Sequence, residues 1–181
     1  MNTYRGVLVL GGARSGKSRY ALDLAQASGR EQVFIATAQA QDREMAERIA
    51  RHRAERDGAW STHEVPLALP QTLATLARPD RVVLVDCLTL WLSNVVLAGQ
   101  EPEPGIAALV QAIAGAAGPL VLVSNEVGQG IVPATPLGRR FRDLQGRLNQ
   151  QVAQACEAVV LVVAGCPTLI KPTPAFSLAL G

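Results

Sequence analysis

Aromatic residues, lysine and cysteine are all scarce in this sequence. Aromatic residues make up 4% of the 181 residues, so the core has to be built from Ala, Val, Leu and Ile. The three cysteines, Cys87, Cys156 and Cys166, form no CxxC pair and are odd in number, which argues against a disulfide framework and a zinc site. Because each has apolar neighbours, we expect three buried, reduced thiols in a cytoplasmic protein. Lysine occurs only at Lys17 and Lys171.

A strong charge and a long apolar run are also missing. The formal net charge of +2 is too small to predict nucleic-acid binding. The most hydrophobic stretch, Val82 to Gly99, is interrupted by Asp86 and Asn94, so no membrane span is expected. Arginine supplies 15 of the 17 basic residues, which suits phosphate or carboxylate binding, although codon bias in a GC-rich genome explains the same excess. The length predicts a single domain over residues 1–181.

Short apolar runs alternate with helical patterns along the chain. The expected strands are Val7–Leu10, Val33–Ala36, Thr62–Val65, Val82–Val85, Leu120–Val123 and, as the last, Val159–Val163. The expected helices are Lys17–Ser28, Asp42–Asp57, one opened by Pro70, one after Asp86, and Ile106–Ala117, which follows a polar loop at Gly99–Pro104. A long amphipathic helix is expected through Leu137, Phe141, Leu144, Leu148 and Val152. This alternation predicts an α/β fold with a mostly parallel sheet and helices on both faces. Ligands of such sheets bind beyond the carboxyl ends of the strands.

A complete phosphate-binding motif follows the first expected strand. The segment Gly11-Gly12-Ala13-Arg14-Ser15-Gly16-Lys17-Ser18 fits G-x-x-x-x-G-K-[ST]. Its glycines allow backbone N–H groups to surround phosphate oxygens at a helix N-terminus. Lys17 is predicted to reach the terminal phosphates, and the Ser18 hydroxyl to bind Mg²⁺.

Asp86 ends a buried apolar run and is the second predicted Mg²⁺ ligand, directly or through water. The alternative is that Asp86 caps the helix that follows. Glu126 lies in a glycine-rich segment after another apolar run, Ser124 to Pro133, where a role on metal or water is open beside an ordinary surface turn.

His52 lies on the expected Asp42–Asp57 helix in line with Met45 and Ile49, so it either extends an apolar stripe or acts chemically. Four arginines surround it in sequence, at positions 48, 51, 53 and 56. Guanidinium groups can gather a triphosphate and lower the imidazole pKa, which keeps the ring neutral and nucleophilic. A solvated, charged helix face explains the arginines equally. His63 has no such neighbours and is expected to be structural.

A second group of arginines occupies the long amphipathic helix. They are Arg139, Arg140, Arg142 and Arg147, near Asn149. An anionic substrate, a neighbouring subunit and a solvated face are all open explanations.

Several ordered segments together resemble the bifunctional adenosylcobinamide kinase / adenosylcobinamide-phosphate guanylyltransferase family of cobalamin biosynthesis. They are the P-loop with Arg19, Ile35-Ala36-Thr37-Ala38, Arg48-Ile49-Ala50-Arg51-His52-Arg53, Asn125 to Pro133, and Phe141 to Gln150. They extend from residue 6 to about residue 165. Some relatives carry two adjacent histidines where this chain has Arg51-His52, so the chain has one candidate nucleophile.

The resemblance implies two reactions: phosphorylation of the cobinamide hydroxyl by ATP or GTP, and transfer of GMP from GTP through a guanylylated histidine. His52 matches the nucleophile, and Lys17 the phosphate-binding lysine. Nucleotide contacts are implied for the P-loop residues Gly11, Gly12, Ala13, Arg14, Ser15, Gly16, Lys17 and Ser18, for Ala36, Thr37 and Ala38, and for Arg53, Ala54, Glu55, Arg56, Glu64 and Asp86. The family also implies a RecA-like sheet, a corrinoid substrate and a homotrimer.

Two other functions fit parts of the pattern. A simple P-loop kinase of a small molecule would use the same loop without a covalent intermediate. A regulatory GTPase would use an Asn/Thr-Lys-x-Asp motif, but neither lysine lies in one.

Overall fold

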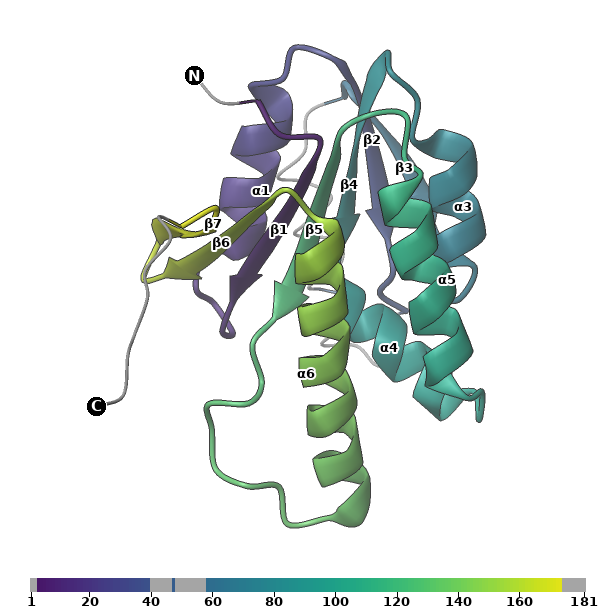
Figure 1. The fold of residues 1–181 in the computed structure, drawn as a ribbon, viewed down its shortest axis with the longest axis vertical. Helices are drawn as coiled ribbons and strands as arrows, with labels where there is room; N and C mark the ends of the chain where they lie inside the picture. The colour runs from purple at the N-terminus through teal and green to yellow at the C-terminus, as the bar shows by residue number, and fades with distance from the viewer. Residues whose placement is uncertain (1–2, 40–46, 48–57, 174–181) are drawn as a thin grey trace, which may run out of the picture.

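The computed structural model describes residues 3–39, 47 and 58–173. Seven strands form one sheet in the order β3-β2-β4-β5-β1-β6-β7 (Figure 1). The strands are β1 (Gly6–Gly11), β2 (Glu31–Ala36), β3 (Trp60–Glu64), β4 (Arg81–Asp86), β5 (Leu120–Asn125), β6 (Ala158–Val163) and β7 (Cys166–Lys171). All neighbouring strands are parallel except β6 and β7, which are antiparallel.

Helices cover both faces of this sheet, as predicted. They are α1 (Lys17–Gln26), α3 (Leu69–Leu76), α4 (Leu88–Leu97), α5 (Pro102–Ala114) and α6 (Pro136–Ala155). One core layer packs α1 against the sheet and the other packs α3, α4, α5 and α6 against the opposite face (Figure 1). Along each buried strand, residues alternate between the two layers, because successive strand side chains point to opposite faces.

The prediction that Val159–Val163 is the last strand is wrong. The chain turns at Ala164 (φ 51°) and Gly165 (φ 79°), and β7 returns beside β6. Apart from half-buried Lys171, β7 is exposed and contains Pro167. A search for buried apolar runs misses such a strand, because an edge strand needs no continuous apolar sequence and tolerates proline.

Several element boundaries also differ from prediction. The polar stretch predicted as the Gly99–Pro104 loop contains the start of α5, which begins at Pro102 and ends at Ala114. Proline is favoured in the first helical turn, where its missing N–H costs nothing. α1 ends at Gln26 instead of Ser28, and β3 begins at Trp60 instead of Thr62.

The expected Asp42–Asp57 helix lies outside the described residues except at Glu47. The cysteine prediction is wrong in part. Cys87 and Cys156 are buried and all three thiols are free, but Cys166 is exposed because it begins the edge strand.

Candidate nucleotide site

The predicted P-loop joins the C-terminal end of β1 to the N-terminus of α1. Gly11 ends the strand, and Gly16, with φ 94°, precedes the first helical residue. Arg14 also adopts a positive φ, 55°. The loop closes on itself, since the Ser15 N–H donates to the Gly12 carbonyl at 3.3 Å. This strand–loop–helix arrangement is the setting in which the motif binds phosphate.

Lys17 is held inside this loop. The residue is 6% exposed, and its Nζ donates to the Gly12 carbonyl at 3.1 Å. Its backbone N–H points to Ser15 Oγ at 3.4 Å. The ammonium group therefore sits at the start of α1, where the free N–H groups of a helix also favour an anion.

The turn between β6 and β7 supports the P-loop from the neighbouring edge of the sheet. The Gly165 N–H donates to the Ser15 carbonyl at 2.8 Å. A Cβ atom on Gly16 would lie 3.1 Å from Gly165 Cα, so the two glycines allow this close approach. The sequence does not predict this contact, because Ala164-Gly165 follows the last expected strand and carries no recognisable motif.

Asp86 ends β4. One strand, β5, separates β4 from β1, the strand that leads into the P-loop. Burial raises the pKa of the adjacent Cys87 thiol to about 12, with the Asp86 carboxylate adding to the rise and Lys17 opposing it. Asp86 and Lys17 are therefore both near enough to act on one thiol. A carboxylate and a serine hydroxyl are suitable Mg²⁺ ligands when phosphates complete the shell, so Asp86 and Ser18 fit this ion chemically.

Thr37 links β2 to the end of β4. Its hydroxyl donates to the Cys87 carbonyl at 2.7 Å and accepts from the Cys87 N–H at 2.9 Å. Its carbonyl accepts from buried Asn94 at 2.8 Å. The hydroxyl proton is thus committed to the protein, and the nucleotide contact implied for Thr37 stays a prediction.

The remaining predicted nucleotide-binding residues divide into two sets. Ala36 pairs in register with Glu64 of β3 on one side and Asp86 of β4 on the other, and half-buried Ala38 follows β2. These strand ends bring separated parts of the sequence to one edge of the sheet. The second set lies outside the described residues, as does the predicted nucleophile His52. This set comprises Arg53, Ala54, Glu55 and Arg56. His63, on β3, is half-buried with Nε2 3.3 Å from Ser61 Oγ.

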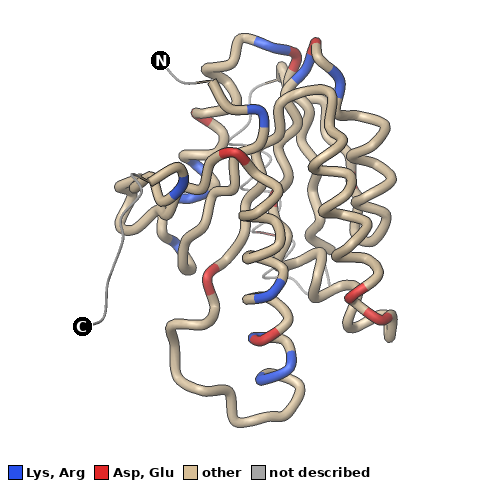
Figure 2. Tube along the Cα trace, viewed as in Figure 1, with Lys and Arg blue, Asp and Glu red and all other residues tan. Residues whose placement is uncertain are grey.

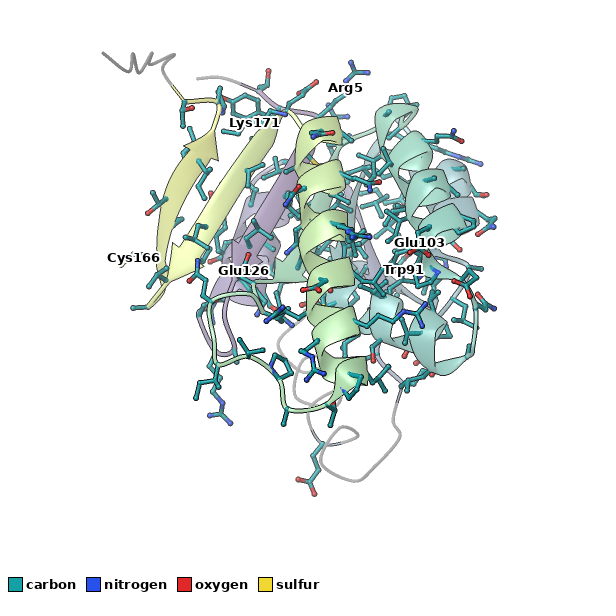
Figure 3. All side chains as sticks on the ribbon, turned by 60° about the horizontal axis from the view of Figure 1, so that its bottom comes forward. Arg5, Trp91, Glu103, Glu126, Cys166 and Lys171 are labelled. Carbon is teal, nitrogen blue, oxygen red and sulfur yellow. The ribbon has the colours of Figure 1, made fainter. Side chains whose placement is uncertain are left out.

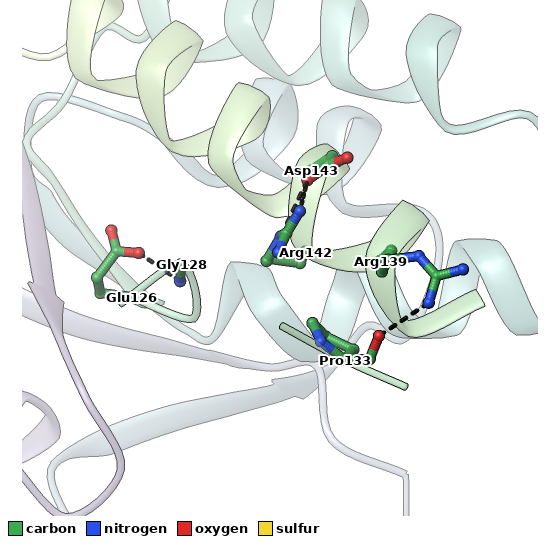
Figure 4. Close-up of polar contacts among 6 residues, drawn as sticks. All are labelled: Glu126, Gly128, Pro133, Arg139, Arg142 and Asp143. Atoms are coloured by element: carbon green, nitrogen blue, oxygen red, sulfur yellow. Dashed lines mark hydrogen bonds and ion pairs between the residues drawn. The ribbon is translucent and has the colours of Figure 1, made fainter. Parts of the chain in front are cut away.

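The segment after β5 also reaches the P-loop. The Glu126 N–H donates to the Gly11 carbonyl at 3.1 Å, and Glu126 Oε1 accepts from the Gly128 N–H at 2.7 Å (Figure 4). Figure 3 shows Glu126 at this edge of the sheet. The carboxylate thus shapes the turn that follows the strand.

Three arginines of α6 contact the protein itself. Arg139 donates to the Pro133 and Ala134 carbonyls, and Arg142 pairs with Asp143 (Figure 4). Arg140 lies 3.6 Å from a Glu101 carboxylate oxygen. Figure 2 shows a single acidic position among the basic ones of α6. The intramolecular partners of these three arginines favour the solvated-face explanation for them.

The described part of the chain contains neither a candidate membrane span nor a cluster of metal-binding side chains. No helix there is both long and apolar enough to cross a bilayer. No group of three or more His, Cys, Asp or Glu side chains is arranged to hold a metal ion in residues 3–39, 47 and 58–173.

Comparisons with known proteins agree with this geometry. The cobinamide kinase / cobinamide phosphate guanyltransferase family model matches residues 7–170. The chain is 50% identical to the bifunctional adenosylcobalamin biosynthesis protein CobP of Pseudomonas aeruginosa, covering 92% of this chain and 98% of that one. It is 41% identical to the bifunctional CobU of Escherichia coli, covering 91% and 99%.

Solved structures confirm the fold. The RadB recombinase superposes with a TM-score of 0.53 at 14% identity, over 86% of this chain and 73% of RadB. The flagellar accessory protein FlaH of Methanocaldococcus jannaschii gives 0.50 at 13% identity, over 92% and 78%. The predicted P-loop NTPase fold with a RecA-like sheet is therefore confirmed. With the matches over most of its length, the chain belongs to the cobinamide kinase / cobinamide phosphate guanyltransferase family.

Proposed function

We propose that this protein phosphorylates the free hydroxyl of adenosylcobinamide with ATP or GTP and then transfers GMP from GTP to the resulting phosphate. The observation that carries the proposal is a formed P-loop, with Lys17 against the Gly12 carbonyl, in a chain matched over residues 7–170 by the family model. A corrinoid and a nucleoside triphosphate are the substrates in this proposal, and the homotrimer implied by the resemblance is its assembly.

In the kinase step the residues chiefly position and neutralise phosphate. The backbone N–H groups from Gly12 to Ser18 and the Lys17 ammonium would surround the phosphates of the nucleotide. Asp86 and Ser18 would hold Mg²⁺, and the ion would supply positive charge to offset that of the phosphates. Phosphoryl transfer needs little further chemistry from the protein, because its barrier falls mainly through positioning and electrostatic stabilisation.

In the guanylyl-transfer step His52 is the proposed nucleophile. Its neutral imidazole nitrogen attacks the α-phosphorus of GTP, a P–N bond forms, and the bond to pyrophosphate breaks. The corrinoid phosphate then attacks the same phosphorus and releases the imidazole. Splitting the reaction in two replaces one difficult displacement by two easier ones. The support for His52 comes from its sequence context alone.

The test is covalent labelling. GTP labelled at the α-phosphate is expected to leave label on the protein, stable to alkali and lost in acid as a phosphoramidate is, whereas γ-labelled GTP is not. His52→Ala should abolish this label and guanylyl transfer but retain much of the kinase activity. Lys17→Ala should lower kinase turnover by about a hundredfold or more, since it removes a positioned charge at the transferring phosphate.

His63→Ala is the matched control and should keep both activities, because His63 contacts Ser61 on β3. An unlabelled wild-type protein, or normal labelling of His52→Ala, would refute the nucleophile and favour the simple kinase. Unchanged kinase turnover in a folded Lys17→Ala variant would refute the proposal that the P-loop binds the nucleotide for the kinase step.

A further inference from the structure

Three neighbouring strands end in residues that share one face of the sheet. β5 lies between β4, which ends at Asp86, and β1, which ends at Gly11. Asn125 ends β5 and pairs in register with Gly11. The residues two positions earlier all pack in the core layer against α1: Val9, Val123 and Leu84. Because side chains alternate along a strand, Gly11, Asn125 and Asp86 belong to the α1 face.

The α1 face is the one on which the P-loop lies. α1 begins at Lys17, directly after the loop. Half-buried Asn125 is therefore located between the strand that leads into the P-loop and the strand that carries the candidate Mg²⁺ ligand. A terminal phosphate that contacts Lys17 and a metal ion on Asp86 would lie over this position.

The backbone of Asn125 is held from the opposite face by two helices. Its N–H donates to Thr89 Oγ1 of α4 at 2.8 Å, and its carbonyl accepts from Asn149 Nδ2 of α6 at 3.1 Å. The β4–β5 pairing ends at Asp86 opposite Val123. These two side chains therefore continue the hydrogen bonding of β5 beyond the last residue paired with β4.

A buried polar cluster fixes these helix side chains in turn. Ser124 Oγ donates to Asn149 Oδ1 at 2.7 Å. Gln145 Nε2 donates both to Ser124 Oγ and to Asn149 Oδ1, each at 2.9 Å. Thr89, Ser124, Gln145 and Asn149 are each less than 10% exposed. A buried polar network of this kind adds little stability compared with well-packed apolar residues. It can, however, hold side chains and backbone in one arrangement. The backbone that it holds is the one beside the P-loop.

We propose that the Asn125 carboxamide binds the terminal phosphate of the nucleotide in the P-loop, and that Thr89 and Asn149 are positioning residues that aim it. The inference rests on the nucleotide site proposed above. The side-chain NH₂ group donates to phosphate oxygens, and such a donor, fixed in advance, stabilises the charge that spreads over these oxygens during transfer. The contact exists only with a triphosphate, because a diphosphate lacks the group that Asn125 binds.

The experiment compares dissociation constants for GDP and for a β,γ-imido GTP analogue. Asn125→Ala should leave GDP affinity unchanged and reduce the preference for the triphosphate by about tenfold, the scale of one hydrogen bond to a charged group. Kinase kcat should fall by about tenfold or more. Gln129→Ala, which removes an exposed carboxamide from the same loop, is the matched control and should change neither quantity.

The positioning role is tested with one variant that removes the Thr89 hydroxyl and one that keeps it. Thr89→Val loses the oxygen that accepts from the Asn125 N–H and should show the same selective loss, whereas Thr89→Ser keeps this oxygen and should restore the triphosphate preference. Equal losses of GDP and triphosphate affinity would overturn the inference, because they indicate a structural role only. An unchanged preference in Asn125→Ala would overturn it as well. A wild-type protein that binds no GDP would instead show that the nucleotide site is wrong, and both proposals would fall.

Discussion

Replacing Gly11 by alanine should destabilise the protein through one identifiable clash. A Cβ atom at this position would lie 2.4 Å from Ser15 Oγ and 2.7 Å from the Val162 carbonyl oxygen. The serine side chain can rotate away, but the Val162 oxygen belongs to the backbone of β6. The strands or the P-loop must therefore shift.

Overpacking of this kind costs about 1–3 kcal/mol. For a chain of this size each kcal/mol lowers Tm by about 2–4 °C, so Gly11→Ala should lower Tm by about 2–12 °C. Thermal and urea unfolding measure this directly. Its GDP affinity should also fall, because Ser15 and the loop are displaced.

Gly12→Ala is the control, with the same chemical change one residue away. No described atom lies within 4 Å of a Cβ built on Gly12, and the substitution also lowers the entropy of the unfolded chain. Its free energy of unfolding should therefore stay within about 0.5 kcal/mol of wild type or rise slightly. If the two variants unfold at the same temperature, the steric explanation is wrong.

Three further predictions concern other positions. Asp86→Asn should raise the Mg²⁺ concentration needed for half-maximal kinase activity, because an amide balances a divalent ion poorly; a titration that overlaps wild type would refute the metal role, and helix capping would not replace it, since α4 is preceded by Cys87 with no side-chain cap. Lys171→Met should lower the free energy of unfolding by about 1–3 kcal/mol, since its ammonium donates to three carbonyls at the C-terminal end of α6 (Figure 3); an unchanged urea midpoint would contradict this. Burial raises the pKa of both Cys87 and Cys156 to about 12. At pH 8, therefore, only exposed Cys166 should react quickly with a thiol reagent, whereas all three cysteines should react after unfolding. The raised native pKa values also make a contribution to the free energy of unfolding that is present below pH 9 and is lost as the pH rises toward 12.

Local sequence signals were sufficient to predict the buried strands of this protein. Apolar runs such as Val82–Val85 and Leu120–Val123 lie in the strands expected for them, because a strand covered on both faces must be apolar throughout. The P-loop was readable for a similar reason, since its glycines and lysine have fixed offsets within eight residues. The family followed from the order of several such segments.

Contacts between distant segments could not be read in this way. The edge strand β7 carries a mixed sequence, so nothing local indicated that its turn supports Ser15 through Gly165. Likewise, Thr89 and Asn149 are polar residues on separate helices, and only the packing of α4 and α6 against β5 brings both to the backbone of Asn125. The sequence by itself determined the phosphate-binding motif and the buried strands, because both depend on local backbone and side-chain chemistry. Only the tertiary structure decided which distant polar residues meet at the backbone of Asn125, because that depends on strand order and register.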